Sequence, residues 1–313
     1  MSFINHSEES SDISWFEDDG TNIGMLNDNG RNRFYDQALK SICQNKTVVD
    51  IGAGTGYLTA LAIKHGAKHV TAVEASSKRC AFLKNMIEKL GYQDRVTIVN
   101  KNYFDTDLHS DIVVSETIGA HIYNENWLRL ADHARTRCQY MIPEKFSINI
   151  DLYENHPIWT TCMQESMAFN YNENNHPEFA DVLNKEMQLE DRGEQANTIP
   201  NLFSHLHNFE DIRLNKIWQS APIVIDHMES MVVPEIIIPS HVFSVLYEKL
   251  QRLSPNDWVF LNINWHATFQ TTSMWVSDTI WQNVCKCIAI PKSDLRIYFS
   301  EQKNKWMFQK LQD

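Results

Sequence analysis

A glycine-rich turn between a strand pattern and a helix pattern constrains this chain more than any other stretch. Residues 48–51 form a short run that is apolar except for Asp50, and Gly52, Gly54 and Gly56 follow at alternate positions. Glycines let the backbone turn tightly and approach a ligand closely, and the next helix offers unpaired N–H groups at its N-terminus. A second strand pattern ends in Glu74, where a carboxylate can accept hydrogen bonds from ribose hydroxyls. The sequence therefore predicts a nucleoside-binding α/β unit.

The spacing of the glycines indicates which nucleoside is bound. A dinucleotide pattern reads G-x-G-x-x-G and would need a glycine where this chain has Tyr57, which disfavours a nicotinamide dehydrogenase. The observed pattern, G-x-G-x-G, is typical of enzymes that use S-adenosylmethionine. We therefore expect S-adenosylmethionine as the cofactor, bound by residues of this turn and of the next strand: Asp50, Gly52, Gly54, Gly56 and Glu74.

Strand and helix patterns alternate through the first part of the chain. Strands are predicted at 47–51, 69–73, 96–99 and 111–115, with helices at 57–65 and from Ser76 or Ser77 to Gly91. A further helix over 31–42 precedes the first strand. This alternation predicts a Rossmann-like, doubly wound sheet, whose ligands bind beyond the carboxyl ends of the strands.

The pattern changes after residue 143. Short runs rich in β-forming residues follow without intervening helices, which predicts an antiparallel β-barrel domain. Residues 159–207 are polar with helical stretches and are expected to form an insertion. The predicted organisation is a flexible N-terminus at 1–13, a cofactor-binding domain at 14–143 and a β domain at 144–313.

Composition excludes several classes of function. The chain has 313 residues and a net charge of −12, which argues against nucleic-acid binding because phosphates need a basic surface. The sequence contains no run of 18 apolar residues, the length needed to span a membrane, and its first residues do not resemble a signal peptide. Six scattered cysteines form no metal-binding pattern and are expected to be reduced thiols. We therefore expect a cytoplasmic protein without a metal.

Two glutamates mark the chemistry of the predicted site. Glu116 comes directly after the strand at 111–115, and Glu125 follows nine residues later across a loop that contains Gly119. A loop of this length can bring both carboxylates to one point, where they repel each other unless a cation lies between them. A guanidinium matches carboxylates through paired hydrogen bonds. The alternative is that Glu125 only caps the helix near Trp127.

The chain resembles the protein arginine N-methyltransferases, whose signature is S-E-x-M-G followed by a second glutamate at this spacing. The resemblance runs from about Trp15 to the C-terminus and also includes residues 48–56, residues 66–76 and Met25–Asp28 with Arg31. Residues 262–265 lie where the family has a threonine-histidine-tryptophan loop. The resemblance implies a dimerisation arm at about 159–207 and a homodimer.

The resemblance also implies roles for individual residues. Arg31 would pair with the carboxylate of S-adenosylmethionine, and Glu74 would hold the ribose. Glu116 and Glu125 would clamp a substrate guanidinium and are the expected catalytic residues. The expected substrate is an arginine-containing protein, and Trp127, Asn264 and Trp265 would contribute to its binding.

The chain departs from the family pattern at three places. Tyr103 and Phe104 stand in the segment expected to contact adenine, where the family often has a glutamate. Asn264 replaces the loop histidine that pairs with an aspartate, although Asp28 is retained, and an Asp28–Asn264 hydrogen bond could preserve the arrangement. Ile118 and Trp127 stand where asymmetrically dimethylating members of the family have methionines that leave room for a second methyl group. The larger indole favours monomethylation.

Two alternatives remain open at this point. The chain could methylate free arginine or another small guanidine in a biosynthetic pathway. It could also be a non-catalytic regulatory subunit that dimerises with an active partner. The regulatory subunit is disfavoured because the chain retains the expected site residues Arg31, Glu74, Glu116 and Glu125. The replacement at Asn264 slightly favours it.

Overall fold

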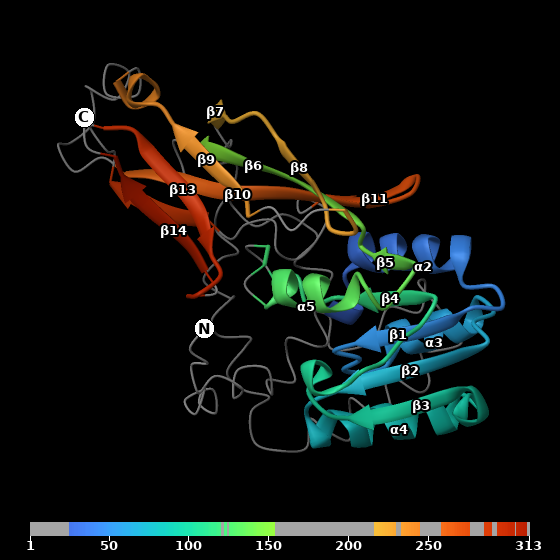
Figure 1. Cartoon of the computed structure of the whole chain (residues 1–313). Coiled ribbons are helices and arrows are strands. Elements are labelled where there is room, and N and C mark those ends of the chain that lie inside the picture. The colour runs from blue at the N-terminus through green and yellow to red at the C-terminus, as the bar shows by residue number, and fades with distance from the viewer. Residues whose placement is uncertain are drawn as a thin grey trace, which may run out of the picture.

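The computed structural model describes most of the predicted cofactor-binding domain and less than half of the predicted β domain. The described residues are 25–119, 122–123, 125–153, 216–229, 233–244, 258–275, 285–289, 293–303 and 305–311. The predicted flexible N-terminus at 1–13 and the predicted arm at 159–207 lie outside these residues. Figure 1 shows an α/β part and a β part side by side, with helix α5 (Trp127–Ala134) on the side of the α/β part that faces the β part.

The α/β part contains the predicted parallel sheet, with the four predicted strands and a fifth strand, β5, that the sequence did not predict. Its strands lie in the order β3-β2-β1-β4-β5, and each pair of neighbours is parallel. Strand β4 is buried along its whole length, which explains its continuous apolar sequence. The strand bounds are β1 Thr47–Ile51, β2 His69–Glu74, β3 Val96–Asn100, β4 Ile112–Ser115 and β5 Tyr140–Ile142.

Side-chain caps explain where the helices begin. The Asp28 carboxylate accepts a hydrogen bond from the N–H of Arg31 at the start of α2, and Ser76 does the same for Arg79 at the start of α4. Helix α3 packs against β1 and β2, and α4 packs against β2 and β3. The bounds are α2 Asn29–Ile42, α3 Tyr57–Lys64 and α4 Ser77–Lys89, with single 3₁₀ turns at Gln93–Arg95 and Tyr103–Asp105.

The β part contains antiparallel strands, as predicted. Strands β6 and β10 pair along most of their length, with β11, β12, β7 and β8 at their sides, and β9, β13 and β14 form a separate three-stranded sheet. The sequence did not predict β5, β7, β11 or β14. The bounds are β6 Lys145–Tyr153, β7 Lys216–Gln219, β8 Ile223–Asp226, β9 Glu235–Ile238, β10 Trp258–Phe269, β11 Thr272–Trp275, β12 Cys285–Ala289, β13 Leu295–Ser300 and β14 Lys305–Lys310.

The two parts share one hydrophobic core. The parallel sheet ends with β5 at Ile142, and the antiparallel pairing begins with β6 at Lys145. The main cluster of buried apolar side chains includes β4 residues and β6 residues. A hydrogen bond from the Thr272 hydroxyl to the Gln37 side chain, 2.9 Å long, also joins β11 to α2. The position of one part relative to the other is therefore fixed by packing.

Three further findings concern thiols, membranes and metals. Cys43, Cys80 and Cys138 are free thiols. None of the helices in the described part of the chain has the length and apolar character that a membrane crossing requires. Among the described residues, no group of three or more histidine, cysteine, aspartate or glutamate side chains could hold a metal ion.

Candidate functional site

The site lies at the carboxyl edge of the parallel sheet. Because all five strands point the same way, the residues that end or follow β1, β2, β3 and β4 meet at this edge. These residues are Gly52, Glu74, Asn100 and Glu116.

The turn after β1 has a backbone that requires glycine. Gly52, Gly54 and Gly56 have φ angles of +70°, +53° and +82°, which side chains of L-residues rarely adopt. A Cβ on Gly52 would lie 2.9 Å from Thr117 Cγ2, and a Cβ on Gly56 would collide with Leu83 Cδ1. The backbone of this turn therefore lies close to the segment that follows β4 and to helix α4.

Glu74 is fixed by the backbone of this turn. One of its carboxylate oxygens accepts a hydrogen bond from the N–H of Gly54 at 2.9 Å, and the other accepts one from the N–H of Ser76 at 2.8 Å. The Asn100 side chain donates to the Glu74 carbonyl at 3.0 Å. A carboxylate has about four acceptor sites, so Glu74 can still accept from two hydroxyls.

Asp50 lies at the end of β1 and is 1% exposed. Its Oδ2 accepts a hydrogen bond of 2.6 Å from the Thr59 hydroxyl, and its Oδ1 has no hydrogen-bond partner among the described residues. Burial raises the pKa of Asp50 to about 7, against the opposing effect of Thr59. A buried acceptor beside the glycine turn fits a ligand that carries a hydrogen-bond donor.

Arg31 and Glu116 form a buried ion pair beside the turn. The distance between Arg31 Nε and Glu116 Oε1 is 3.1 Å, and Arg31 Nη1 also donates to the Met25 carbonyl and to Asn32 Oδ1. Burial lowers the pKa of Arg31, but the Glu116 carboxylate outweighs it, so the net shift is upward. The guanidinium is therefore always charged.

The two glutamates that the sequence singled out interact across their loop. Burial, and then the negative charge of Glu116, raise the pKa of Glu125 to about 8, while Arg31 acts in the opposite direction. Burial also raises the pKa of Glu116 above its ordinary value, and Arg31 again opposes the shift. Two carboxyl groups thus share one cation, and a second cation would favour ionisation of both.

Tyr103 and Phe104 pack against α5. The Tyr103 ring makes an edge contact with His133 at a centroid distance of 5.0 Å, and Arg129 Cζ lies 4.0 Å from the centroid of the Phe104 ring. Burial raises the pKa of Tyr103 to about 12. Their role as adenine contacts stays a prediction.

Trp127 and Trp265 lie in the core between the two parts. Both side chains are fully buried. The Trp127 ring makes an edge contact with Phe146 at a centroid distance of 5.4 Å, and Trp265 contacts the same ring at 6.1 Å. The indole of Trp127 therefore occupies a fixed place at the start of α5.

Asn264 belongs to a row of polar side chains on β6 and β10. Its amide donates to Asn149 Oδ1 at 3.4 Å, and the Asn149 amide donates to Asp151 Oδ1 at 2.8 Å. Asn264 and Asn149 face each other in the register of the two strands. The predicted bond between Asp28 and Asn264 stays a prediction.

Tyr35 is a site residue that the sequence reasoning missed. Its hydroxyl donates to the Ser115 carbonyl at 2.9 Å, and the Arg31 guanidinium lies 5.7 Å from its ring centroid. Arg31 and Tyr35 are four residues apart on α2 and therefore share one face of the helix. This spacing could have indicated from the sequence that Tyr35 lies beside Arg31.

Comparison with known proteins identifies relatives of part of the chain. The model of rRNA small subunit methyltransferase G (GidB) matches residues 33–142. Protein arginine N-methyltransferase 1 of Saccharomyces cerevisiae is 33% identical over 141 residues, which is 42% of this chain and 40% of that protein. Histone-arginine methyltransferase CARMER of Drosophila mojavensis is 30% identical over 141 residues, 42% of this chain and 26% of that protein. The chain spans less than half the length of these curated relatives.

Solved structures extend the similarity to most of the chain. The crystal structure of PRMT6-SAH aligns with a TM-score of 0.56 at 15% identity, over 92% of this chain and 98% of that one. The Trypanosoma brucei PRMT1 enzyme-prozyme heterotetrameric complex with AdoHcy aligns with a TM-score of 0.55 at 16% identity, over 89% and 87%. At these identities the alignments establish the fold.

The parallel sheet and its glycine turn define a class I methyltransferase fold. Within this fold class, the chain is similar in sequence to protein arginine N-methyltransferase 1 over 141 residues and similar in fold to PRMT6.

Proposed function

We propose that the protein is an S-adenosylmethionine-dependent arginine N-methyltransferase. The observation that supports this proposal best is the buried group of Arg31, Glu116 and Glu125 beside the glycine turn. One buried cation faces two carboxyl groups there, and a substrate guanidinium would supply the missing positive charge.

Four groups of this chain fit S-adenosylmethionine. The glycine turn would accept the ligand against its backbone, and the carboxylate of Glu74 would hold the ribose hydroxyls. Asp50 Oδ1 is a buried acceptor for the ammonium group, and Arg31 is a cation for the carboxylate of the methionine portion. When bound, the cofactor supplies an electrophilic methyl group.

Glu116 and Glu125 would bind and orient the guanidinium. Their carboxylates would align one nitrogen with the methyl group, so that positioning and exclusion of water supply most of the rate gain. A guanidinium nitrogen that gains a methyl group must release one proton. The Glu125 carboxylate, ionised beside the bound guanidinium, is the proposed acceptor of this proton.

The proposed product is monomethylarginine, because Trp127 stands where asymmetrically dimethylating relatives have a methionine. Its fully buried ring packs against Phe146 and cannot easily move aside. The main product should therefore carry one methyl group. Asymmetric dimethylarginine as the main product of purified protein, measured by mass spectrometry, would overturn this part of the proposal.

The proposed substrate is an arginine residue in a protein, and the proposed assembly is a homodimer. The relative from Trypanosoma brucei forms a heterotetrameric complex of enzyme and prozyme. A regulatory subunit is therefore the second candidate function. Methyl transfer by the purified chain alone would exclude it, and light scattering would measure the oligomeric state.

The decisive experiment compares arginine-rich peptides and free arginine as methyl acceptors in one assay. We expect methylated peptide as the main product by mass spectrometry. Methylation of free arginine alone would instead favour a biosynthetic enzyme for small guanidines. Binding of S-adenosylhomocysteine, measured by calorimetry, tests the cofactor separately from turnover.

Substitutions distinguish the site residues that bind the cofactor from those that act on the substrate. Glu116→Gln should lower turnover at least about 10²-fold while S-adenosylhomocysteine binds nearly as tightly as before, because Arg31 keeps its charge. Arg31→Ala should instead weaken cofactor binding. Retained turnover in the first variant, or unchanged cofactor affinity in the second, would contradict the assigned role.

A further inference from the structure

The backbone on both sides of Glu125 is unusual. Ile122, Tyr123 and Asn126 have positive φ angles of 28°, 73° and 64°, although none of them is glycine. Isoleucine and tyrosine rarely adopt such angles, so the surrounding structure must hold them there. Since Glu125 lies between Tyr123 and Asn126, whatever holds this backbone also sets the position of the Glu125 carboxylate.

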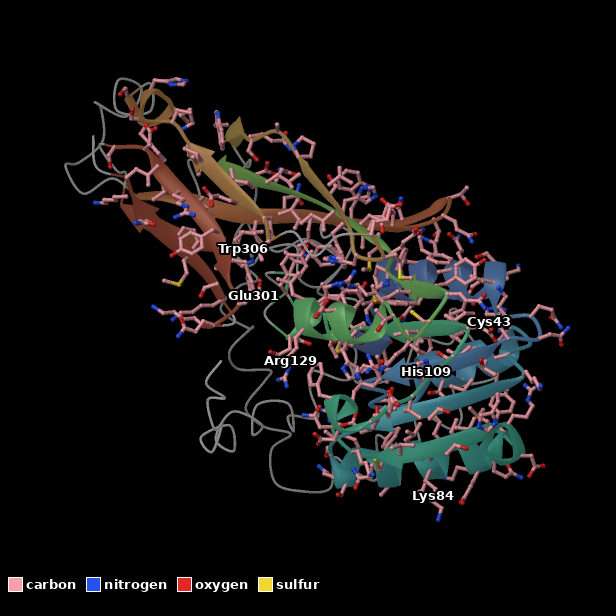
Figure 2. The ribbon with its side chains drawn as sticks, viewed as in Figure 1. Cys43, Lys84, His109, Arg129, Glu301 and Trp306 are labelled. Carbon is pink, nitrogen blue, oxygen red and sulfur yellow. The ribbon has the colours of Figure 1, made fainter. Side chains whose placement is uncertain are left out.

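Trp306 on β14 makes the first of two polar contacts from the β part to the loop between Glu116 and Glu125. Its indole N–H donates to the Ile122 carbonyl at 3.1 Å in a buried position. The ring also stacks on Tyr123 at a centroid distance of 6.5 Å and an angle of 17°. Figure 2 shows Trp306 on β14, on the side of the β part that faces α5.

His227, in the turn after β8, makes the second contact. Its Nε2 lies 3.2 Å from the Tyr123 hydroxyl, and its ring makes edge contacts with Tyr123 and Trp127. The backbone N–H of His227 donates to the Glu144 carbonyl at 3.1 Å, which fixes the turn. His227 is fully buried, so the imidazole has little freedom to turn away.

These contacts connect two distant strands to one loop. Trp306 fixes the carbonyl of Ile122, and His227 fixes the side chain of the next residue, Tyr123. The loop would otherwise relax toward ordinary negative φ angles, which would carry Glu125 away from Glu116 and Arg31.

We propose that Trp306 and His227 are positioning residues that hold Glu125 in place for a guanidinium substrate. This inference rests on the proposed function. It assigns to the β part a role in presenting the carboxylate, in addition to its packing. Glu74 is instead held by the backbone of Gly54 and Ser76 and by the Asn100 side chain, so cofactor affinity should not depend on the two positioning residues.

The test uses the full chain with Trp306→Phe, which removes the N–H donor and keeps an aromatic ring. We expect kcat/KM for an arginine-rich peptide to fall at least tenfold, while the Kd for S-adenosylhomocysteine stays within twofold. Trp275→Phe is the matched control, because Trp275 is an exposed residue on β11 and is 44% accessible. The control should keep the rate of the unsubstituted protein.

Tyr123→Phe provides a milder second variant if Trp306→Phe does not fold, because it removes only a hydroxyl group. The same pattern of lower kcat/KM and unchanged cofactor affinity is expected. A kcat/KM within twofold of the unsubstituted protein, or a parallel loss of cofactor affinity, would overturn the inference. Absence of methyl transfer by the unsubstituted protein would instead count against the proposed function, so the two failures are distinguishable.

Discussion

At the scale of single residues, the protonation of Glu125 has a measurable consequence. Its raised pKa of about 8 means that the free protein holds a proton on this carboxyl group at pH 7. A guanidinium beside it would favour the ionised form. Substrate binding is therefore coupled to proton release.

We predict that binding of an arginine peptide at pH 7 releases about 0.9 proton per site, if the bound Glu125 ionises fully. Calorimetry of the S-adenosylhomocysteine-loaded protein in phosphate and in Tris measures this release, because the two buffers differ in ionisation enthalpy. Glu125→Gln should remove the difference between buffers. Binding enthalpies that are equal in both buffers for the unsubstituted protein would contradict the prediction.

The same residue predicts how affinity changes with pH. Because the proton must leave Glu125, the apparent affinity for the peptide should rise as pH increases from 6 to 8 and level off above the pKa of about 8. A free protein with an ordinary carboxyl group at this position would show no such rise.

At the scale of secondary structure elements, the glycine turn carries a stability requirement as well as a binding role. Gly56 begins α3 with a φ of +82°, and its Cα faces Leu83 of α4, which is fully buried. The turn therefore lies directly on the helix that follows β2.

We predict that Gly56→Ala destabilises the protein by about 1–2 kcal/mol from the left-handed backbone and by a further 1–3 kcal/mol from overpacking against Leu83. Gly91→Ala is the matched control. Its φ is +72°, but a Cβ would meet nothing within 4 Å, so only the backbone cost applies. Urea unfolding measures both variants, and equal losses would refute the packing argument.

Helices and strands were predicted well from the sequence wherever the residues that mark them lie close together in the chain. The glycine spacing, the strand before it and Glu74 all lie within one βαβ unit, and Ser76 and Gly91 mark the ends of α4. Strand β14 lacked such a signal, because its six residues alternate only weakly between buried and exposed positions. Strand β5 has only three residues, and β7 and β11 each contain only two apolar residues, whereas the predicted strands β8 and β9 contain three.

The site was predicted only in part, for a related reason. Glu116 and Glu125 are close in sequence, whereas the partners that fix them are not. Tyr35 reaches Ser115 across 80 residues, Tyr123 reaches His227 across 104 and Trp306 reaches Ile122 across 184. No periodicity links residues so far apart, so only the folded chain reveals these contacts.

At the scale of the whole molecule, His227 makes the junction of the two parts sensitive to acid. Burial lowers the pKa of His227 to about 4, below its ordinary value of 6.5. The unfolded chain therefore binds a proton between these pH values that the folded chain does not bind. The contribution of the neutral, buried His227 to the free energy of unfolding is therefore complete above pH 6.5 and is lost as the pH falls toward 4.

We predict that His227 lowers the free energy of unfolding by about 3 kcal/mol when the pH falls from 7 to 4. Other buried groups act in the opposite direction, since burial raises the pKa of Asp50 and Glu125. The comparison with His227→Gln isolates the histidine, because the variant should lose less stability on acidification. Denaturant unfolding at several pH values measures the difference, and parallel curves would contradict the prediction.

The contact between Trp306 and Ile122 also sets an order of events during synthesis. Trp306 follows Ile122 by 184 residues, so at roughly 5–20 residues per second the ribosome makes the glutamate loop about 10–40 s before its anchor. The parallel sheet needs nothing beyond β5, which ends at Ile142. A nascent chain therefore completes the cofactor half of its site well before the half that receives the guanidinium.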